Sequence, residues 1–185
     1  MLVLPFAKMI PLSPNTLTLI GLLVSIASAV VFARGDIFAG GLLILLSGLF
    51  DILDGAVARA SDKMTPFGGV LDSVCDRYAD AVVFVGIISG VLTGNISQAP
   101  IMEIPLWLWC LVALIGSYLV SYTRARAEGA GASSVNVGIA ERPERMLILV
   151  AGALTGFISL AIVAIVILTH ITIVQRVLYA KRSLS

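Results

Sequence analysis

The stretch 146–174 constrains the fold most, because about 29 consecutive residues carry no Asp, Glu, Lys or Arg. One straight helix of that length would reach about 43 Å, which exceeds the roughly 30 Å hydrocarbon core of a bilayer. A break at Thr155 and Gly156 would instead give two membrane helices. Over the whole chain, 59% of the residues are hydrophobic and 12% are charged, whereas soluble domains carry about 25% charged residues. The sequence therefore predicts an all-α integral membrane protein.

Turn and helix-start signals divide the rest of the chain into further spans. Ser13 and Pro14 precede the first apolar run, as a capping residue and a proline often do, and Pro66 suits the first turn of a later helix. Residues 1–10 are expected to form a short interfacial segment, and residues 1–185 a single domain. We expect six transmembrane helices, at residues 15–33, 38–59, 66–93, 106–127, from near Ile139 or Ala140 to the break, and 159–178.

Basic residues are distributed unequally between the two sides that six spans would create. One side would carry only Arg34, whereas the other would carry Lys8, Arg59, Lys63, Arg124, Arg126, Arg142, Arg145, Lys181 and Arg182. Cytoplasmic segments are enriched in Lys and Arg, so we expect both termini to be cytoplasmic and the protein to lie in the cell (plasma) membrane. Five spans would place the last two basic residues outside.

Four aspartates lie close together in this apolar chain: Asp51, Asp54, Asp72 and Asp76. The first pair is spaced i, i+3 and the second i, i+4, so each pair lies on one face of a helix. An aspartate near the membrane centre costs roughly 2.5–3.5 kcal/mol on insertion scales, and four like charges need a neutralising partner. Carboxylates without histidine or thiolate ligands favour Mg²⁺, Mn²⁺ or Ca²⁺ over zinc. We therefore expect one or two divalent cations here, on the cytoplasmic side.

Small residues and an arginine accompany these acids. Gly55 and Ala58 would let a ligand approach closely, Gly68 leaves space at the start of the next helix, and Arg59 could meet a phosphate or pair with an acid. Mg²⁺ often shares phosphate oxygens of a substrate, which indicates a phosphate-bearing substrate. Two other interpretations of the acids are a salt-bridge cluster with Arg59 and Arg77, and the ion pathway of a small ion-coupled transporter.

The spacing of these residues resembles the signature of the CDP-alcohol phosphotransferase family. The signature reads here as Asp51, Asp54, Gly55, Ala58, Arg59, Gly68, Asp72 and Asp76. The six-helix layout and the segment from Ser13 to Thr18 are also similar to that family. The resemblance implies a membrane enzyme, typically a homodimer, that transfers a phosphatidyl-type group from a CDP-linked lipid to an alcohol and releases CMP. We expect its substrates and membrane lipids as partners, and no nucleic acid.

The resemblance also implies roles for individual residues. Asp51, Asp54 and Asp72 would bind Mg²⁺ or Mn²⁺, as two ions, while Asp76 would bind metal too or act as the general base on the acceptor hydroxyl. Asp80, one turn beyond the signature, is expected to be a structural partner rather than a ligand. The CDP-lipid site would be lined by Asn15, Asp54, Gly55, Ala58, Arg59, Gly68 and Asp72.

A second polar group lies at the junction of the fourth and fifth predicted helices. The forked guanidinium of arginine suits phosphate, so Arg124 and Arg142 predict an anion-binding pocket near the metal. This segment resembles that of phosphatidylinositol phosphate synthases and their archaeal counterparts, which use inositol 1-phosphate. That resemblance implies an acceptor-phosphate site made of Ser121, Arg124, Arg142, Arg145 and Arg176. A phosphatidylglycerol phosphate synthase using glycerol 3-phosphate is the alternative, and diacyl and archaeol lipid chains both remain open.

Overall fold

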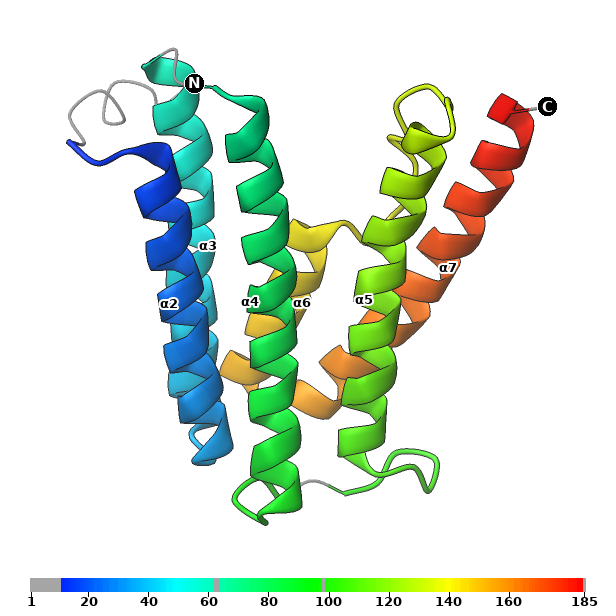
Figure 1. Cartoon of the computed structure of the whole chain (residues 1–185). Coiled ribbons are helices and arrows are strands. Elements are labelled where there is room, and N and C mark those ends of the chain that lie inside the picture. The colour runs from blue at the N-terminus through cyan, green and yellow to red at the C-terminus, as the bar shows by residue number, and fades with distance from the viewer. Residues whose placement is uncertain (1–10, 62–63, 98, 185) are drawn as a thin grey trace.

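The computed structural model describes residues 11–61, 64–97 and 99–184. The predicted interfacial segment, residues 1–10, lies outside these ranges, as does Lys63 of the predicted charge pattern. The described chain contains no β-strand and forms six helices, which confirms the all-α fold class: α2 (Pro14–Ala33), α3 (Ile37–Ala60), α4 (Pro66–Leu92), α5 (Leu106–Gly129), α6 (Arg142–Thr155) and α7 (Ile158–Leu184). In Figure 1 the short α6 lies behind and between the long helices α4 and α5.

Capping side chains fix where the first three helices begin. Ser13, Asp36 and Thr65 are the N-cap residues of α2, α3 and α4, and each side chain accepts a hydrogen bond from a backbone N–H of the first turn. Such caps satisfy amide groups that the start of a helix leaves unpaired. Pro14 and Pro66 follow two of these caps directly, where the missing N–H of proline costs nothing. The predicted starts of these helices are therefore correct to within one residue.

The long apolar stretch is interrupted at Gly156, as predicted. Gly156 has φ 80° at the end of α6, a left-handed conformation that glycine adopts without steric cost. The start of α6 differs from the prediction, because the helix begins at Arg142 rather than near Ile139 or Ala140. The N–H groups of those two residues instead donate to the Thr172 hydroxyl in α7. They thus lie outside the helix and are held against α7.

Two predicted helix ends were also too short. Glu128, expected in the loop, belongs to the last turn of α5, which ends at Gly129. The last helix, α7, continues beyond residue 178 to Leu184 and includes Lys181 and Arg182. Neither glycine nor proline occurs in this final segment, so nothing in the sequence stops the helix there.

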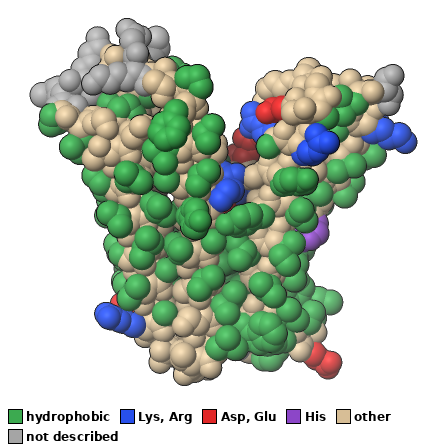
Figure 2. All heavy atoms as spheres, in the orientation of Figure 1, with side chains coloured by type: hydrophobic (Ala, Val, Ile, Leu, Met, Phe, Trp, Pro, Cys, Tyr) green, Lys and Arg blue, Asp and Glu red, His purple; other side chains and the backbone are tan. Residues whose placement is uncertain are grey.

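Length and composition make four helices able to cross a membrane: α2, α3, α5 and α7. By contrast, α6 has 14 residues, or about 21 Å at 1.5 Å per residue, and α4 carries several charged residues in its first half. Many leucine, isoleucine and valine side chains are exposed, and hydrophobic side chains cover much of the face drawn in Figure 2. These are the features of a multi-pass membrane protein.

The helix α2 holds α3 and α4 at close range. A Cβ atom on Gly86 of α4 would lie 2.3 Å from the carbonyl oxygen of Ala29 in α2, so only glycine permits this approach. On the other side, the Ser47 hydroxyl of α3 donates to the Gly21 carbonyl of α2 at 3.0 Å. Because α2 packs against both neighbours, it sets the separation of the two aspartate-bearing helices.

The remaining helices form a second group. α5 packs against α7, and α6 packs against both α3 and α7. The two groups are therefore joined through α6 and also through α4, which packs against α5. The main buried cluster, which includes Phe84, Leu149 and Ile162, fills the interior where the groups meet. At the opposite end the groups separate, and Figure 2 shows a hollow there with Lys or Arg side chains inside it. The polar residues predicted from the sequence surround this hollow.

Candidate active site

The ends of α3 and α4 bring three of the four signature aspartates together. Asp51 in α3 and Asp72 and Asp76 in α4 each offer one oxygen, and these oxygens lie within 4.8 Å of one another. The i, i+4 spacing places the two α4 residues on one face. All three side chains are half-buried, so they are accessible from the hollow. Three carboxylate oxygens without nitrogen or sulfur donors fit a hard cation such as Mg²⁺ or Mn²⁺.

Asp54 lies beside this group but is not part of it. It is 6% exposed, and its Oδ2 accepts a hydrogen bond of 2.6 Å from the Thr18 hydroxyl in α2. With 3.6 residues per turn, an i, i+3 pair is offset by about 60° around the helix. Asp54 therefore points more toward α2 than Asp51 does.

A cavity of about 200 Å³ adjoins the aspartates between α2, α3 and α4. Arg59 supplies its positive charge, and a Cβ atom on Gly55 would lie only 3.2 Å from the Arg59 Nη1 atom. The small residues of the signature thus keep the space beside this arginine open. The lining includes all seven residues predicted for the CDP-lipid site: Asn15, Asp54, Gly55, Ala58, Arg59, Gly68 and Asp72.

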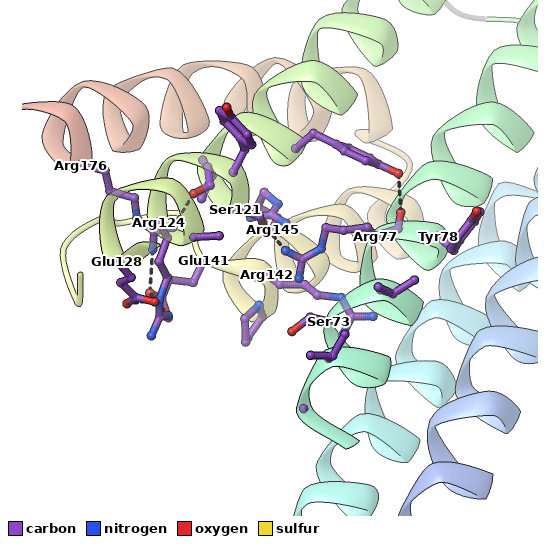
Figure 3. A pocket seen from close by; sticks show the side chains of 18 of the residues that line it. Ser73, Arg77, Tyr78, Ser121, Arg124, Glu128, Glu141, Arg142, Arg145 and Arg176 are labelled. Carbon is purple, nitrogen blue, oxygen red and sulfur yellow. Dashed lines mark hydrogen bonds and ion pairs between the residues drawn. The ribbon is translucent and has the colours of Figure 1, made fainter. Parts of the chain in front are cut away.

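A larger cavity, of about 1050 Å³, is lined by Arg77 and Arg142, two arginines that contact the aspartates (Figure 3). It is walled mainly by α4, α5 and the start of α6, with one arginine from α7. Several guanidinium groups from different helices in one cavity favour an anionic ligand. The lining includes all five residues predicted to bind the acceptor phosphate, Ser121, Arg124, Arg142, Arg145 and Arg176, and also Arg77.

The arginines of this larger cavity are not equally available. Arg145 and Arg176 are buried; Arg145 donates to Asp80 at 2.8 Å, and Arg176 donates to two backbone carbonyls and to Glu141 at 2.9 Å. These contacts tie the start of α6 to α4 and α7. Arg124 is 40% exposed and pairs with Glu128 and Glu141, at 3.2 Å and 3.8 Å. Arg124 is therefore the more accessible guanidinium.

Arg77, expected from the sequence only as a partner in a salt-bridge cluster, also lines the larger cavity. Its guanidinium donates to the Ser121 hydroxyl in α5 and to Asp76 Oδ2 at 3.2 Å, and the Tyr118 hydroxyl donates to its carbonyl at 3.0 Å. Arg77 thus joins α4 to α5 across the larger cavity. Neighbours at i, i+1 on a helix do not face each other, so its position next to Asp76 did not reveal this contact.

Arg142 connects the larger cavity with the aspartate cluster. Its Nη1 pairs with Asp51 Oδ2 and, at 2.8 Å, with Asp76 Oδ1, while its Nε lies 3.4 Å from Asp80 Oδ1. Asp80 is fully buried and also pairs with Arg145, which agrees with the expectation of a structural partner. The salt-bridge interpretation is thus correct in part, with Arg142 and Arg77 as the cations that contact the cluster.

The family model for CDP-alcohol phosphatidyltransferases matches residues 11–181. The chain therefore belongs to this family of enzymes, which confirms the resemblance carried by the aspartate signature and favours an enzyme over an ion-coupled transporter. A relative in Methanothermobacter thermautotrophicus, archaetidylinositol phosphate synthase, is 39% identical over 186 residues, covering 97% of this chain and 89% of the relative.

Two crystal structures of Mycobacterium tuberculosis phosphatidylinositol phosphate synthase share the fold. The structure with CDP-DAG bound has a TM-score of 0.84 and 33% identity, over 98% of this chain and 94% of that chain. The structure in complex with manganese and citrate has a TM-score of 0.85 and 32% identity, over 98% and 90% of the two chains. The similarity extends along nearly the whole length, and a protein of this fold has thus been solved with a divalent cation.

Proposed function

We propose that the protein transfers a phosphatidyl-type group, carrying diacylglycerol or archaeol chains, from a CDP-linked lipid to a hydroxyl of inositol 1-phosphate and releases CMP. The observation that carries the proposal is that the aspartate cluster adjoins two cavities: Asp72 lines the smaller one, and Arg142, which contacts Asp51 and Asp76, lines the larger one. One cavity is lined by the residues predicted for the CDP-lipid, and the other by arginines suited to a phosphorylated acceptor. The names of the relatives, which are inositol phosphate synthases, support inositol 1-phosphate as the acceptor.

The four signature aspartates would hold the divalent metal, Mg²⁺ or Mn²⁺ as two ions. The convergence of Asp51, Asp72 and Asp76, with Asp54 beside them, supports this assignment. When bound, the metal supplies positive charge that stabilises the negative charge on the pyrophosphate and on the departing CMP. Arg59 and the small residues around it would bind the CDP part of the donor in the smaller cavity.

Asp76 would act as the general base. Its two oxygens pair with Arg142 and Arg77, both of which line the larger cavity, so the carboxylate lies one side chain away from that cavity. In the transfer step the Asp76 carboxylate takes the proton of the acceptor hydroxyl. The hydroxyl oxygen attacks the lipid-side phosphorus, and the bond from that phosphorus to CMP breaks, with its electron pair leaving on CMP.

The acceptor phosphate would be bound by the five predicted residues of the larger cavity. The exposed Arg124 is suited to contact the phosphate directly, since guanidinium groups bind phosphate through paired N–H donors. Arg145 and Arg176 would add positive potential while holding the wall of the cavity in place. Ser121, which accepts from Arg77, completes the predicted set.

We also propose six membrane spans in a homodimer, with both termini and the active site on the cytoplasmic side. In Figure 1 the starts of α2 and α4 lie at the same end of the molecule as the ends of α3, α5 and α7. That end carries Arg59, Arg124, Arg126, Lys181 and Arg182, whereas the loop between α2 and α3 carries Arg34. This distribution agrees with the enrichment of Lys and Arg in cytoplasmic segments.

A panel of acceptors tests the proposed function. Purified protein is supplied with a CDP-linked lipid and Mg²⁺, and CMP release is compared for inositol 1-phosphate, glycerol 3-phosphate and unphosphorylated inositol. We expect release with inositol 1-phosphate and little with the other two. Faster release with glycerol 3-phosphate would instead identify a phosphatidylglycerol phosphate synthase. Parallel assays with diacyl and archaeol donors would define the lipid.

A further inference from the structure

Resting on the proposed function, we propose that the Arg142 guanidinium competes with the divalent cation for the carboxylates of Asp51 and Asp76. Cation binding then releases Arg142 from these aspartates to the phosphate of the acceptor. Metal binding and acceptor binding reinforce each other as a result, and Arg142 is the residue through which they are coupled.

The contacts of Arg142 place it on the metal-ligating groups themselves. Its Nη1 pairs with Asp51 Oδ2 and lies 2.8 Å from Asp76 Oδ1. These two carboxylates belong to the group of three whose oxygens lie within 4.8 Å of one another. The side chain is only 12% exposed, so little water separates its charge from theirs. A dication among the same oxygens would face a guanidinium at contact distance, and the two positive charges repel strongly.

Asp80 gives the released side chain a fixed anchor. Arg142 also donates through Nε to Asp80 at 3.4 Å, while Asp80 is fully buried and held by Arg145 at 2.8 Å. Nη1 can therefore leave Asp51 and Asp76 while Nε keeps its partner. The same side chain lines the larger cavity, where a phosphate can accept hydrogen bonds from the planar guanidinium. Asp80 acts as a positioning residue in this arrangement.

Arg77 and Arg124 show why Arg142 is the coupling residue. Arg77 also contacts Asp76, but it is tied to Ser121 in α5, so releasing it would separate α4 from α5. Arg124 lines the same cavity and pairs with Glu128 and Glu141 instead of the aspartates. Arg142 alone among these three contacts two of the clustered aspartates. Coupling between binding sites is reciprocal, so the acceptor must strengthen metal binding as much as metal strengthens acceptor binding.

Manganese titration of the purified protein, followed by the electron paramagnetic resonance signal of free Mn²⁺, tests this competition without turnover. Arg142→Gln removes the competitor and should tighten Mn²⁺ binding about tenfold, within the usual range for coupled sites. The matched control Arg124→Gln removes the same charge from the same cavity and should leave the Mn²⁺ affinity unchanged. Equal affinities in wild type and Arg142→Gln would overturn the competition while leaving the proposed function intact.

A second arm measures the coupling itself in the wild-type protein. Addition of inositol 1-phosphate should tighten Mn²⁺ binding in wild type and have no such effect in Arg142→Gln. If the variant does not fold, as judged by size-exclusion chromatography, the wild-type titration decides: no tightening overturns the inference. Tightening that persists in a folded Arg142→Gln also overturns it, because the coupling then does not pass through this residue. A wild-type protein that binds no Mn²⁺ would refute the metal centre of the proposed function as well.

Discussion

The two cavities beside the aspartates differ in how the sequence builds them. The smaller cavity is lined by residues from two segments, 14–18 and 54–72. The first is the start of α2, and the second contains the end of α3, the loop after it and the start of α4, two helices that both pack against α2. The larger one takes its lining from residues between 66 and 176, on four helices. Its arginines also form many contacts with the protein itself. The smaller cavity therefore follows from a local sequence pattern, whereas the larger cavity depends on tertiary packing.

The aspartate cluster that adjoins both cavities carries the largest expected effect. Removal of divalent cations with EDTA should abolish CMP release, because the clustered carboxylates and the pyrophosphate then lack the charge that neutralises them. CMP is measured before chelation, in EDTA, and after excess Mg²⁺ or Mn²⁺ is restored. Turnover that persists in EDTA would show that the reaction does not need a metal ion, and the two cavities would then not share a metal centre.

Asp76 should have the next largest effect, because it belongs to the cluster of aspartates and also contacts Arg77 and Arg142, which line the larger cavity. Asp76→Asn should lower the rate of CMP release by about 10²- to 10⁴-fold, the usual contribution of a general base. Asp36→Asn is a suitable control, since Asp36 caps α3 in the loop between α2 and α3 and asparagine caps helices equally well. A folded Asp76→Asn variant with near-normal turnover would rule Asp76 out as the base.

The smaller cavity can be blocked without touching the arginines of the larger one. Gly55→Leu would place a side chain against Arg59. It should raise the KM for the CDP-lipid by at least roughly 10-fold, because a mismatch of a single methylene in a binding pocket already changes discrimination by about 10- to 200-fold. The KM for inositol 1-phosphate should change little. Gly48→Leu, on the same helix but with open space around its Cβ position, controls for helix propensity. Equal increases in both KM values would show that the cavities do not separate donor from acceptor.

The same contrast explains how much could be predicted from the sequence. Helix starts were predictable because Ser13 and Thr65 act through neighbours in the chain. The break at Gly156 was predictable because membrane thickness limits helix length. The start of α6 was not, because the N–H groups before it bond to Thr172, about 30 residues further along the chain. Local signals cannot report a partner at that distance.

Residue type was predictable at the site, but pairing was not. The spacing of the aspartates indicated which faces they occupy, and three of them do converge. The arginines were correctly expected in one cavity, yet nothing in the sequence indicated that Arg142 pairs with Asp51, 91 positions away. Arg145 and Arg176 have the residue type of a phosphate ligand, but their burial and internal hydrogen bonds make them part of the cavity wall. Such roles depend on how α6 and α7 pack.

Substitution of Arg124 should have the smallest effect of these variants, and the effect should be limited to the KM for the proposed acceptor. Arg124 pairs with Glu128 and Glu141 and is 40% exposed, so Arg124→Ala should keep the fold. The substitution removes one charged hydrogen-bond donor, and this loss should raise the KM for inositol 1-phosphate about 10-fold. The KM for the CDP-lipid should not change. Arg126→Ala, on the same turn of α5 but outside the cavity lining, is the matched control. If both variants have the same KM for inositol 1-phosphate, Arg124 is an ordinary basic residue at the membrane surface, and the acceptor phosphate is bound by the more buried arginines.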